Sequence, residues 1–279
     1  MNEPLISVYI PTKNRSDLLH RAVSSVLVQT YNNFEVIVVD DGSTDNTNDV
    51  VLELSKRSKN IIYLKNNRSK GACYCRNLAI KNAKGRYVTG LDDDDFFDEN
   101  RLQDFVINLK YHDLIFSGCK VITTKKNKII HRNRKNKYVG IDDILKGNCV
   151  GNQMFFSRSD FIEVGGFDEC FPAWQDYDLW IRLIKLKGKA YCTGTQTYIV
   201  DQSHVHERIS GSKKKWDESL QLFEAKYALD KKYFVYWEIS VLEEFKEVRI
   251  KDYFRFLLLT SDIKSFMKKV ILYLTSSRY

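Results

Sequence analysis

The chain has 279 residues, of which 43% are hydrophobic and 29% are charged, and its formal net charge is +8. These values fit one globular domain with or without an appendage, and the three prolines and 13 glycines argue against low-complexity or long disordered segments. No run of about 18 apolar residues occurs, so the sequence predicts no membrane-spanning helix.

The six cysteines are scattered, and no CxxC pair supports a structural zinc site. Residues 1–4 lead directly into a short apolar run without the features of a signal peptide, so we expect a cytoplasmic protein with reduced thiols. The basic charge would suit nucleic acid, anionic lipid or a phosphorylated substrate. Since no helix-turn-helix, zinc-finger or RNP-like signature is present, we expect no nucleic acid partner.

Strand-like and helix-like segments alternate through the first 110 residues. β-rich apolar runs predict strands at residues 6–11, 34–39, 61–65 and 87–91. Helical spacing of apolar residues predicts helices at residues 16–29, 46–56 and 71–82. This alternation is typical of a parallel, doubly wound α/β sheet.

The second half of the chain is less regular. It predicts strands at residues 114–123, 128–138 and 152–157, and a helix at residues 176–186. From about residue 213 the composition is basic, aromatic and helical to the end. This change is the one candidate for a domain boundary.

Four consecutive aspartates, Asp92 to Asp95, follow the predicted strand at residues 87–91. Such a run of like charges either lies in water as a solvated turn or holds a cation. Its place at the carboxyl end of a parallel strand, where open α/β sheets bind ligands, favours the cation. Carboxylate oxygens suit Mg²⁺ or Mn²⁺, and in an extended segment Asp92 and Asp94 would share one face. The βα turns contain no glycine-rich phosphate loop, so a bound diphosphate would need a metal and basic side chains.

The order and spacing of several short motifs resemble glycosyltransferase family 2, whose members have the GT-A fold. The motifs are residues 11–15 (PTKNR), 39–45 (VDDGSTD), Gly71 with Arg76 and Asn77, 84–87 (KGRY), 91–95 (LDDDD) and 176–182 (DYDLWIR). The resemblance covers about residues 5–212. It implies a Rossmann-like, mostly parallel sheet flanked by helices. Residues 1–110 would bind the nucleotide sugar, residues 111–212 the acceptor, and residues 213–279 would form a helical extension.

The same resemblance implies inverting transfer of a sugar from a UDP-sugar, with Mn²⁺ or Mg²⁺ as the cofactor. We expect the acceptor to be a hydroxyl of a saccharide on a polyprenyl diphosphate, as in O-antigen or capsule assembly, at the inner face of the plasma membrane. Glucose or galactose is the sugar expected from similar enzymes. Two other functions stay open: a sugar-phosphate nucleotidyltransferase, although residues 11–15 lack the glycines of that class, and a non-catalytic protein that binds nucleotide sugars.

By resemblance, Asp94 is the expected direct metal ligand and Asp92 its partner, although four adjacent carboxylates leave the register open by one residue. Thr12 and either Asp40 or Asp41 would contact uracil and ribose. The structural alternative is that Asp41 and Ser43 only cap the next helix. The remaining donor contacts are expected from Pro11, Asn14, Arg15, Ser43, Arg76, Asp93, Asp95, His206 and Arg208.

Sugar transfer to a hydroxyl requires a base that takes the hydroxyl proton as the new bond forms. Relatives in this family have Glu-Asp at the position of Gln175-Asp176, and the Asp is their base. Asp176 is therefore the expected base and Asp178 the second candidate. The structural alternative for Asp176 is an N-cap of the helix that follows.

Residues 250–273 combine aromatic and aliphatic residues with Lys and Arg. A basic, aromatic helix of this kind can lie on an anionic membrane, or it can pack over the rest of the protein. Membrane contact would suit an acceptor carried on a lipid diphosphate.

Overall fold

The computed structural model describes residues 3–123, 128–151, 153–203, 212–228 and 230–276. The chain divides into two compact units. The sheet unit contains residues 1–141, 150–169 and 175–206, and the helical unit contains residues 142–149, 170–174 and 207–279. His206 and Arg208, two of the expected donor contacts, lie outside the described residues.

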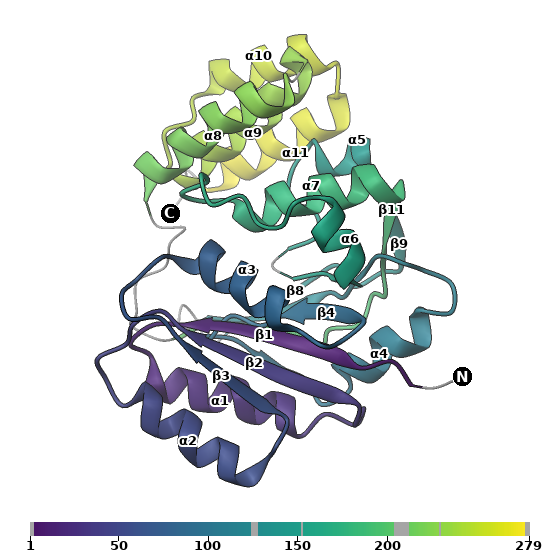
Figure 1. Ribbon diagram of the computed structural model, residues 1–279. Helices are drawn as coiled ribbons and strands as arrows, with labels where there is room; N and C mark the ends of the chain where they lie inside the picture. Colours follow the sequence, from purple (N-terminus) through teal and green to yellow (C-terminus); the bar gives the residue numbers. More distant parts are fainter. Residues whose placement is uncertain (1–2, 124–127, 152, 204–211, 229, 277–279) are drawn as a thin grey trace. The chain divides into compact units, whose positions relative to one another are not determined.

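The first half of the sheet unit has the predicted alternation of strands and helices (Figure 1). The parallel strands are β1 (Ile6–Thr12), β2 (Phe34–Asp40), β3 (Ile61–Lys65) and β4 (Tyr87–Gly90). The helices between them are α1 (Ser16–Leu27), α2 (Thr47–Arg57) and α3 (Ala72–Asn82). Figure 1 shows α1 and α2 on one face of these strands and α3 on the other, so the predicted α/β architecture is confirmed.

Burial on both faces explains why β2 shows no polar alternation. All seven of its residues are buried, as expected for a central parallel strand covered by helices on each side. On α1, the side chains of Leu19, Val23 and Val26 are 0% exposed and face the sheet. Full burial of an aliphatic side chain of this size contributes about 1.5–3 kcal/mol to stability.

The remaining strands complete two sheets in the sheet unit. The larger sheet has the order β3-β2-β1-β4-β10-β6-β11-β9, with β10 antiparallel to β4. Its added strands are β6 (Ile115–Phe116), β9 (Lys137–Gly140), β10 (Phe155–Ser157) and β11 (Lys189–Cys192).

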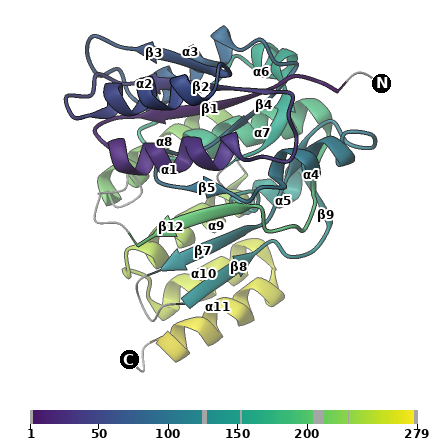
Figure 2. The same ribbon diagram turned by 90° about the horizontal axis from the view of Figure 1, so that it is seen from below.

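The smaller sheet has the order β5-β12-β7-β8 (Figure 2). It consists of β5 (Phe96–Phe97), β7 (Cys119–Thr123), β8 (Lys128–Arg132) and β12 (Tyr198–Gln202). The accompanying helices are α4 (Arg101–Asn108), α6 (Arg158–Glu163) and α7 (Gln175–Lys187), and the short α5 (Ile141–Ile144) begins here and continues into the helical unit.

Two of the predicted strands are wrong as single elements, because each one divides between the two sheets. Residues 114–123 form β6 in the larger sheet and β7 in the smaller one, and residues 128–138 divide in the same way into β8 and the start of β9. The first break falls at Gly118, whose backbone passes so close to its neighbours that a Cβ would lie 2.5 Å from the carbonyl oxygen of Arg132. The second break contains Asn133, which has a positive φ of 53°. Both turns redirect the chain in ways that apolar alternation does not reveal.

The helical unit has an aromatic core. Its helices are α8 (Lys213–Tyr227), α9 (Lys231–Glu244), α10 (Ile250–Thr260) and α11 (Ile263–Ser276). Trp174, from the short segment 170–174, packs edge-on against Trp216 with ring centroids 5.0 Å apart and against Phe223 at 5.6 Å. The Ser219 hydroxyl donates to the carbonyl oxygen of Ala173 at 2.9 Å. None of the described helices is both long enough and apolar enough to cross a bilayer.

Candidate active site

The aspartate run lies where three parallel strands end. Asp92 follows β4 after Leu91, Thr12 closes β1, and Thr12 is in register with Asp40 at the end of β2. The Thr12 hydroxyl donates to Oδ2 of Asp93 at 2.8 Å. The carboxyl edge of the sheet therefore carries the cluster of acidic side chains that the sequence predicted.

The run is a turn and not an extended segment. The backbone N–H of Asp95 donates to the carbonyl oxygen of Asp92 at 3.0 Å. The extended backbone on which the pairing of Asp92 with Asp94 was based is therefore wrong, and their joint role at a metal stays a prediction. The Arg15 guanidinium bridges two neighbouring carboxylates of the turn, since it bonds Asp93 at 3.0 Å and Asp94 at 3.2 Å. Burial is the largest influence on Asp93 and raises its pKa to about 6.

Asp92 points to a different part of the site. Its Oδ1 accepts hydrogen bonds from Arg76 at 3.0 Å and from the Gln153 amide at 3.3 Å. Arg76 comes from α3 and Gln153 precedes β10, so residues far apart in the chain converge on this carboxylate. The Gln153 Oε1 in turn accepts from the Tyr9 hydroxyl at 2.9 Å. Asp92 is the most accessible carboxylate of the run, with a side chain that is 27% exposed.

Asp95 is the most deeply buried of the four aspartates, with 2% exposure. Its Oδ1 accepts the backbone N–H of Asp201 from β12 at 2.9 Å, and the Tyr198 hydroxyl also bonds it. Burial raises the pKa of Asp95 well above its usual range. Asp95 therefore links the aspartate turn to the smaller sheet through Asp201. Little of the Asp95 side chain is exposed for the expected contact with donor hydroxyls.

The two aspartates at the end of β2 hold loops together. Asp40 is 0% exposed and accepts from the Ser43 N–H at 2.7 Å and the Tyr63 hydroxyl at 2.8 Å. Asp41 accepts four hydrogen bonds from residues 66–71, and these bonds outweigh burial and lower its pKa to about 2. A carboxylate has about four acceptor positions, so a contact of Asp41 with uracil would replace one of these bonds. Asp40 therefore has no exposed surface with which it could contact uridine. A contact between Asp41 and uridine stays a prediction.

The loop after β1 is fixed to the loop after β2. Asn14 has a positive φ of 51°, and its backbone N–H donates to the Ser43 hydroxyl at 2.8 Å. Its side-chain oxygen accepts the Thr44 N–H at 2.8 Å. Pro11 lies within β1 beside Val39. Asn14 and Ser43, expected to contact the donor, thus have a scaffolding role in the free protein.

The second acidic centre lies in the first turn of α7. Asp176 is partly exposed, and burial, which is opposed by the positive charge of Arg76, raises its pKa to about 6. The nearby Asp92 also contributes to this rise. Arg76 therefore bonds the aspartate run and also acts electrostatically on the base candidate.

Asp178, the alternative base, has a structural role. It is 0% exposed, and its Oδ2 accepts from Arg182 Nε at 3.0 Å and from a second Arg182 nitrogen at 2.6 Å. A fully buried, ion-paired carboxylate cannot meet an acceptor hydroxyl without local unfolding. Asp176 is therefore the one base candidate of the pair that the structure leaves accessible.

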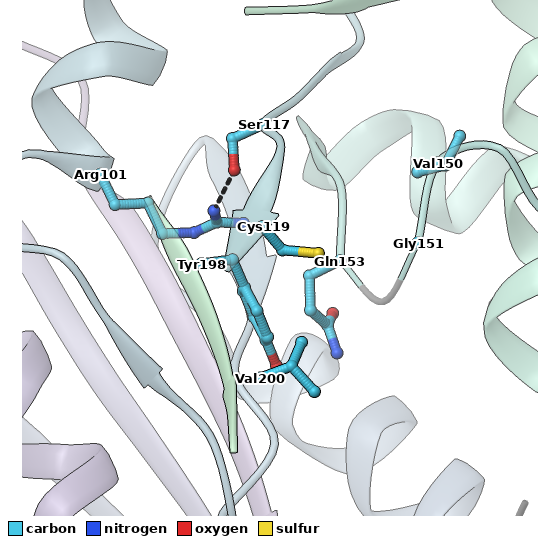
Figure 3. A pocket seen from close by; sticks show the side chains of 8 residues that line it. All are labelled: Arg101, Ser117, Cys119, Val150, Gly151, Gln153, Tyr198 and Val200. Carbon is cyan, nitrogen blue, oxygen red and sulfur yellow. Dashed lines mark hydrogen bonds between the residues drawn. The ribbon is translucent and has the colours of Figure 1, made fainter. Parts of the chain in front are cut away.

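A small cavity is lined by residues that include two partners of the aspartate turn, Gln153 and Tyr198 (Figure 3). It encloses about 20 Å³, which is room for about one water molecule, and its lining includes Arg101, Gln153 and Tyr198. Arg101 is 1% exposed and bonds the Ser117 hydroxyl at 2.6 Å, but no carboxylate of the described residues pairs with it. Its guanidinium lies over the Tyr198 ring, 5.0 Å from the centroid. Burial lowers the pKa of Arg101 to about 10, so it stays charged at neutral pH.

Sequence reasoning missed the residues that support the aspartate turn: Tyr9, Gln153, Tyr198, Arg101, Arg21 and Asp201. Arg21 bonds both the Asp201 side chain and, at 2.6 Å, the carbonyl oxygen of Asp94. None of these six belongs to a recognisable motif. The sequence offers no local signal for them, since Arg101 follows Asp98, Glu99 and Asn100 and Gln153 follows Asn152.

A substitution at Gly90, the last residue of β4, tests whether Gln153 and Tyr9 support the aspartate turn. A Cβ at Gly90 would lie 2.1 Å from Gln153 Oε1 and 2.4 Å from the Tyr9 ring. We expect Gly90→Ala to lower the free energy of unfolding by about 1–3 kcal/mol through overpacking. Transfer should slow as well, because the displaced Gln153 loses its bond to Asp92.

Urea unfolding and initial rates measure the two effects of Gly90→Ala. The control is Gly188→Ala, where a Cβ meets nothing within 4 Å and only the positive φ of 81° opposes the change. It should cost about 1–2 kcal/mol through the left-handed backbone alone and leave transfer intact. A Gly90→Ala protein with unchanged stability and rate would contradict the close packing of Gln153 and Tyr9 around Asp92.

The carboxylates of the site offer only some of the ligands that a divalent metal needs. No three Asp, Glu, His or Cys side chains gather into a complete metal site within the part of the chain that the structure describes. Mg²⁺ and similar cations at phosphate-binding sites commonly take one or two carboxylates from the protein and the rest from phosphates and water. Asp92 and Asp94 offer such carboxylates, so the residues fit a metal that is bound together with a diphosphate.

Comparison with known proteins gives a consistent result. The family model "Glycosyl transferase family 2" matches residues 7–165. WcaA of Escherichia coli K12, named as a glycosyl transferase of colanic acid biosynthesis, is 35% identical over 221 residues, 77% of this chain and 78% of WcaA. WfgD of Escherichia coli, a UDP-Glc:alpha-D-GlcNAc-diphosphoundecaprenol beta-1,3-glucosyltransferase, is 32% identical over 66% of this chain and 72% of WfgD. Some relatives are longer, and this chain spans 31% of an uncharacterized glycosyltransferase of Rickettsia bellii.

Among solved structures, TarS 1–349 of Staphylococcus aureus in complex with UDP-GlcNAc matches with a TM-score of 0.71. The match covers 91% of this chain and 79% of the TarS chain at 17% sequence identity. At this identity the similarity establishes the fold.

Proposed function

The chain belongs to glycosyl transferase family 2 and is a glycosyltransferase, and from this membership we propose that it moves a hexose from a UDP-sugar to a hydroxyl of a lipid-diphosphate-linked saccharide. The observation that carries this proposal is the position of Arg76. It bonds Asp92 at the carboxyl edge of the sheet and lowers the pKa of Asp176 at the start of α7. One cation thus influences both acidic centres, to which we assign different tasks.

The donor would bind at the ends of β1, β2 and β4. The names of two comparison proteins support a UDP-sugar, since WfgD is named for UDP-Glc and the TarS complex holds UDP-GlcNAc. Arg15 and Arg76 supply positive charge beside the aspartate run. The Arg76 Nε is buried without a hydrogen-bond partner in the described protein. A diphosphate oxygen would satisfy this donor, which agrees with the expected contact between Arg76 and the diphosphate.

Asp92 and Asp94 would hold Mn²⁺ or Mg²⁺ together with the donor. When bound, such a metal stabilises the negative charge that develops on the departing UDP. Arg15 bonds Asp94 and Arg76 bonds Asp92 in the free protein, so these cations neutralise the carboxylates there. Donor binding would place both guanidinium groups beside phosphate oxygens as well.

Asp176 would act on the acceptor. Its pKa of about 6 leaves it ionised at neutral pH, yet more basic than an ordinary carboxylate. It would take the proton of the acceptor hydroxyl while that oxygen forms a bond to the anomeric carbon. The bond from this carbon to the diphosphate oxygen breaks on the opposite side, and UDP leaves with the electron pair. Attack from the side opposite the leaving group inverts the anomeric configuration, by the logic of inverting glycoside hydrolysis.

The acceptor class is drawn from the relatives. WfgD is named for an acceptor on diphosphoundecaprenol, and WcaA is named for biosynthesis of the polysaccharide colanic acid. A surface polysaccharide intermediate on a polyprenyl diphosphate, at the cytoplasmic face of the membrane, would suit both. Glucose and galactose are the sugars that we would test first.

This proposal can be tested with a panel of UDP-sugars and one synthetic GlcNAc-diphosphate-lipid acceptor. We expect one UDP-hexose to give a product larger by one hexose, detected by mass spectrometry, with release of UDP. Chelator should stop the reaction and Mn²⁺ should restore it. Release of pyrophosphate in place of UDP would refute the proposal in favour of nucleotidyl transfer, and full activity in chelator would refute the role of the metal.

A further inference from the structure

Two adjacent helices of the helical unit expose apolar side chains along one side. On α10, Ile250, Phe254 and Leu258 are 42%, 55% and 83% exposed. On α11, Ile263, Met267, Ile271 and Leu274 are 66%, 50%, 55% and 56% exposed. Spacings of three and four residues place the members of each set on one side of their helix. We call these seven side chains the apolar stripes.

Buried aromatic side chains outside the stripes help to hold α10 in place. The inner side of α10 is anchored by Tyr253 and Phe256, which are 2% and 0% exposed. Phe256 packs edge-on against Tyr236 of α9, with ring centroids 4.7 Å apart. The two helices contact each other through Phe254 and Phe266 at 5.5 Å. Isolated exposed apolar residues are common on proteins, but two such sets on helices that contact each other indicate an interaction surface.

Lysines border both stripes. Lys251 follows Ile250, and Lys264 and Lys268 directly follow Ile263 and Met267 along α11. All three side chains are exposed, and no carboxylate of the described residues pairs with them. The two carboxylates of this region have other partners, since Asp252 accepts from the Arg249 N–H at 2.8 Å and Asp262 bonds the Tyr236 hydroxyl. The surface around the stripes is therefore positively charged.

We propose that the apolar stripes bind the surface of an anionic lipid bilayer. An amphipathic helix with Lys beside its apolar side lies in the plane of the interface, with apolar side chains among the acyl chains and ammonium groups beside the lipid phosphates. Neither α10, with 11 residues, nor α11, with 14 residues, is long enough to cross the bilayer.

The positive charge of the lysines beside the stripes favours lipid over a second copy of the chain as the binding partner. If two copies joined through these stripes, Lys251, Lys264 and Lys268 of each would approach the same lysines of the other, and like charges in an interface are costly. An anionic lipid surface offers the opposite charge over the whole area. The inference does not depend on the chemistry of the catalytic site, since every residue in it belongs to the helical unit.

Vesicle flotation with the full-length protein tests the proposal. We expect binding to vesicles that contain phosphatidylglycerol to be at least tenfold tighter than binding to phosphatidylcholine vesicles, and to weaken with added salt. The double variant Leu258→Ser, Met267→Ser should bind at least tenfold more weakly than the natural chain. Lys264→Glu with Lys268→Glu should lose the preference for anionic lipid.

The controls use exposed residues of the sheet unit. Leu52 and Ile162 are 51% and 61% exposed, and their double change to Ser should leave vesicle binding intact. Circular dichroism confirms folding, and UDP binding measured on the same samples reports separately on the catalytic site. Equal vesicle binding by the natural chain and the Leu258→Ser, Met267→Ser variant would overturn the proposal. A dimer in light scattering that only this variant loses, without vesicle binding by the natural chain, would assign the stripes to a second copy.

Discussion

Replacing Asp176 by asparagine is expected to lower kcat by about 10²–10⁴-fold, the usual contribution of a general base. The asparagine amide keeps nearly the same shape but cannot accept the hydroxyl proton. Affinity for UDP should change little, since Asp176 acts on the acceptor. The folded state disfavours the Asp176 charge, because its pKa is raised to about 6. Removal of this charge should therefore leave the unfolding midpoint at pH 7 unchanged or higher.

The dependence of kcat/KM on pH examines the same assignment. A base acts only when deprotonated, so the rate should rise with pH through about 6 and level off above that value. Burial raises the pKa of Asp176, Arg76 and the Tyr177 backbone N–H lower it, and Asp92 raises it. The residual activity of Asp176→Asn should lack this rise. A variant that keeps near-full activity, or the same pH profile, would exclude Asp176 as the base.

Asp178→Asn is the matched comparison, two residues further along the same helix. It removes the carboxylate that pairs with Arg182, whose side chain is only 15% exposed. Breaking a buried pair in this way costs about 3–5 kcal/mol. We therefore expect a large loss of stability, with kcat of the folded fraction mostly retained. The two variants together separate a role in catalysis from a role in the fold.

The second large effect is expected for Asp94→Asn, which should reduce transfer by about two to three orders of magnitude. Calorimetric titration with UDP is the more specific measurement. The natural chain should bind UDP more tightly with Mn²⁺ than without it, and Asp94→Asn should lose this difference. Arg15→Met removes the guanidinium that bonds Asp94 at 3.2 Å and should weaken UDP binding under both conditions.

Glu99→Gln serves as the control for Asp94→Asn, because Glu99 is an exposed carboxylate a few residues after the run. It should behave like the natural chain in both measurements. If Asp94→Asn keeps the Mn²⁺ effect and Asp93→Asn loses it, the register of the metal ligands is shifted by one residue. If neither variant changes UDP binding, the run does not hold a metal.

The features predicted from sequence are those with local causes. The strands β1 to β4 and the helices between them follow from apolar runs and their spacing, and the edge of the sheet that carries Thr12, Asp40 and Asp92 follows from parallel order. The family resemblance favoured Asp176 over Asp178 as the base, but helical spacing could not exclude Asp178, because both lie in the first turn of α7. What separates them is the direction of each side chain, since only Asp178 meets Arg182 one turn later.

The remaining features depend on contacts between distant residues. The sequence gives no sign that arginines neutralise the four aspartates. Arg15 and Arg76 lie 16 or more positions away in sequence from the carboxylates that they bond. Asp95 is anchored by Asp201, which is 106 positions further along the chain. The single backbone bond from Asp95 to Asp92 turns the run and removes the alternation that an extended segment would have. None of these contacts produces a local pattern in the sequence.

The way the helical unit is assembled from the chain has a consequence for protein engineering. Its core includes Trp174 and Phe171, which come from a segment inside the sequence of the sheet unit, and Phe171 packs against Phe223 of α8 at 4.8 Å. Truncation before α8 would therefore expose the aromatic rings that immediately precede the candidate base in the chain. Replacement of the C-terminal helices by those of a relative would need a matched exchange of residues 170–174. The helices after residue 212 are thus not an exchangeable tail, and chimeras that seek a new acceptor or a new membrane preference must be cut at several points in the chain.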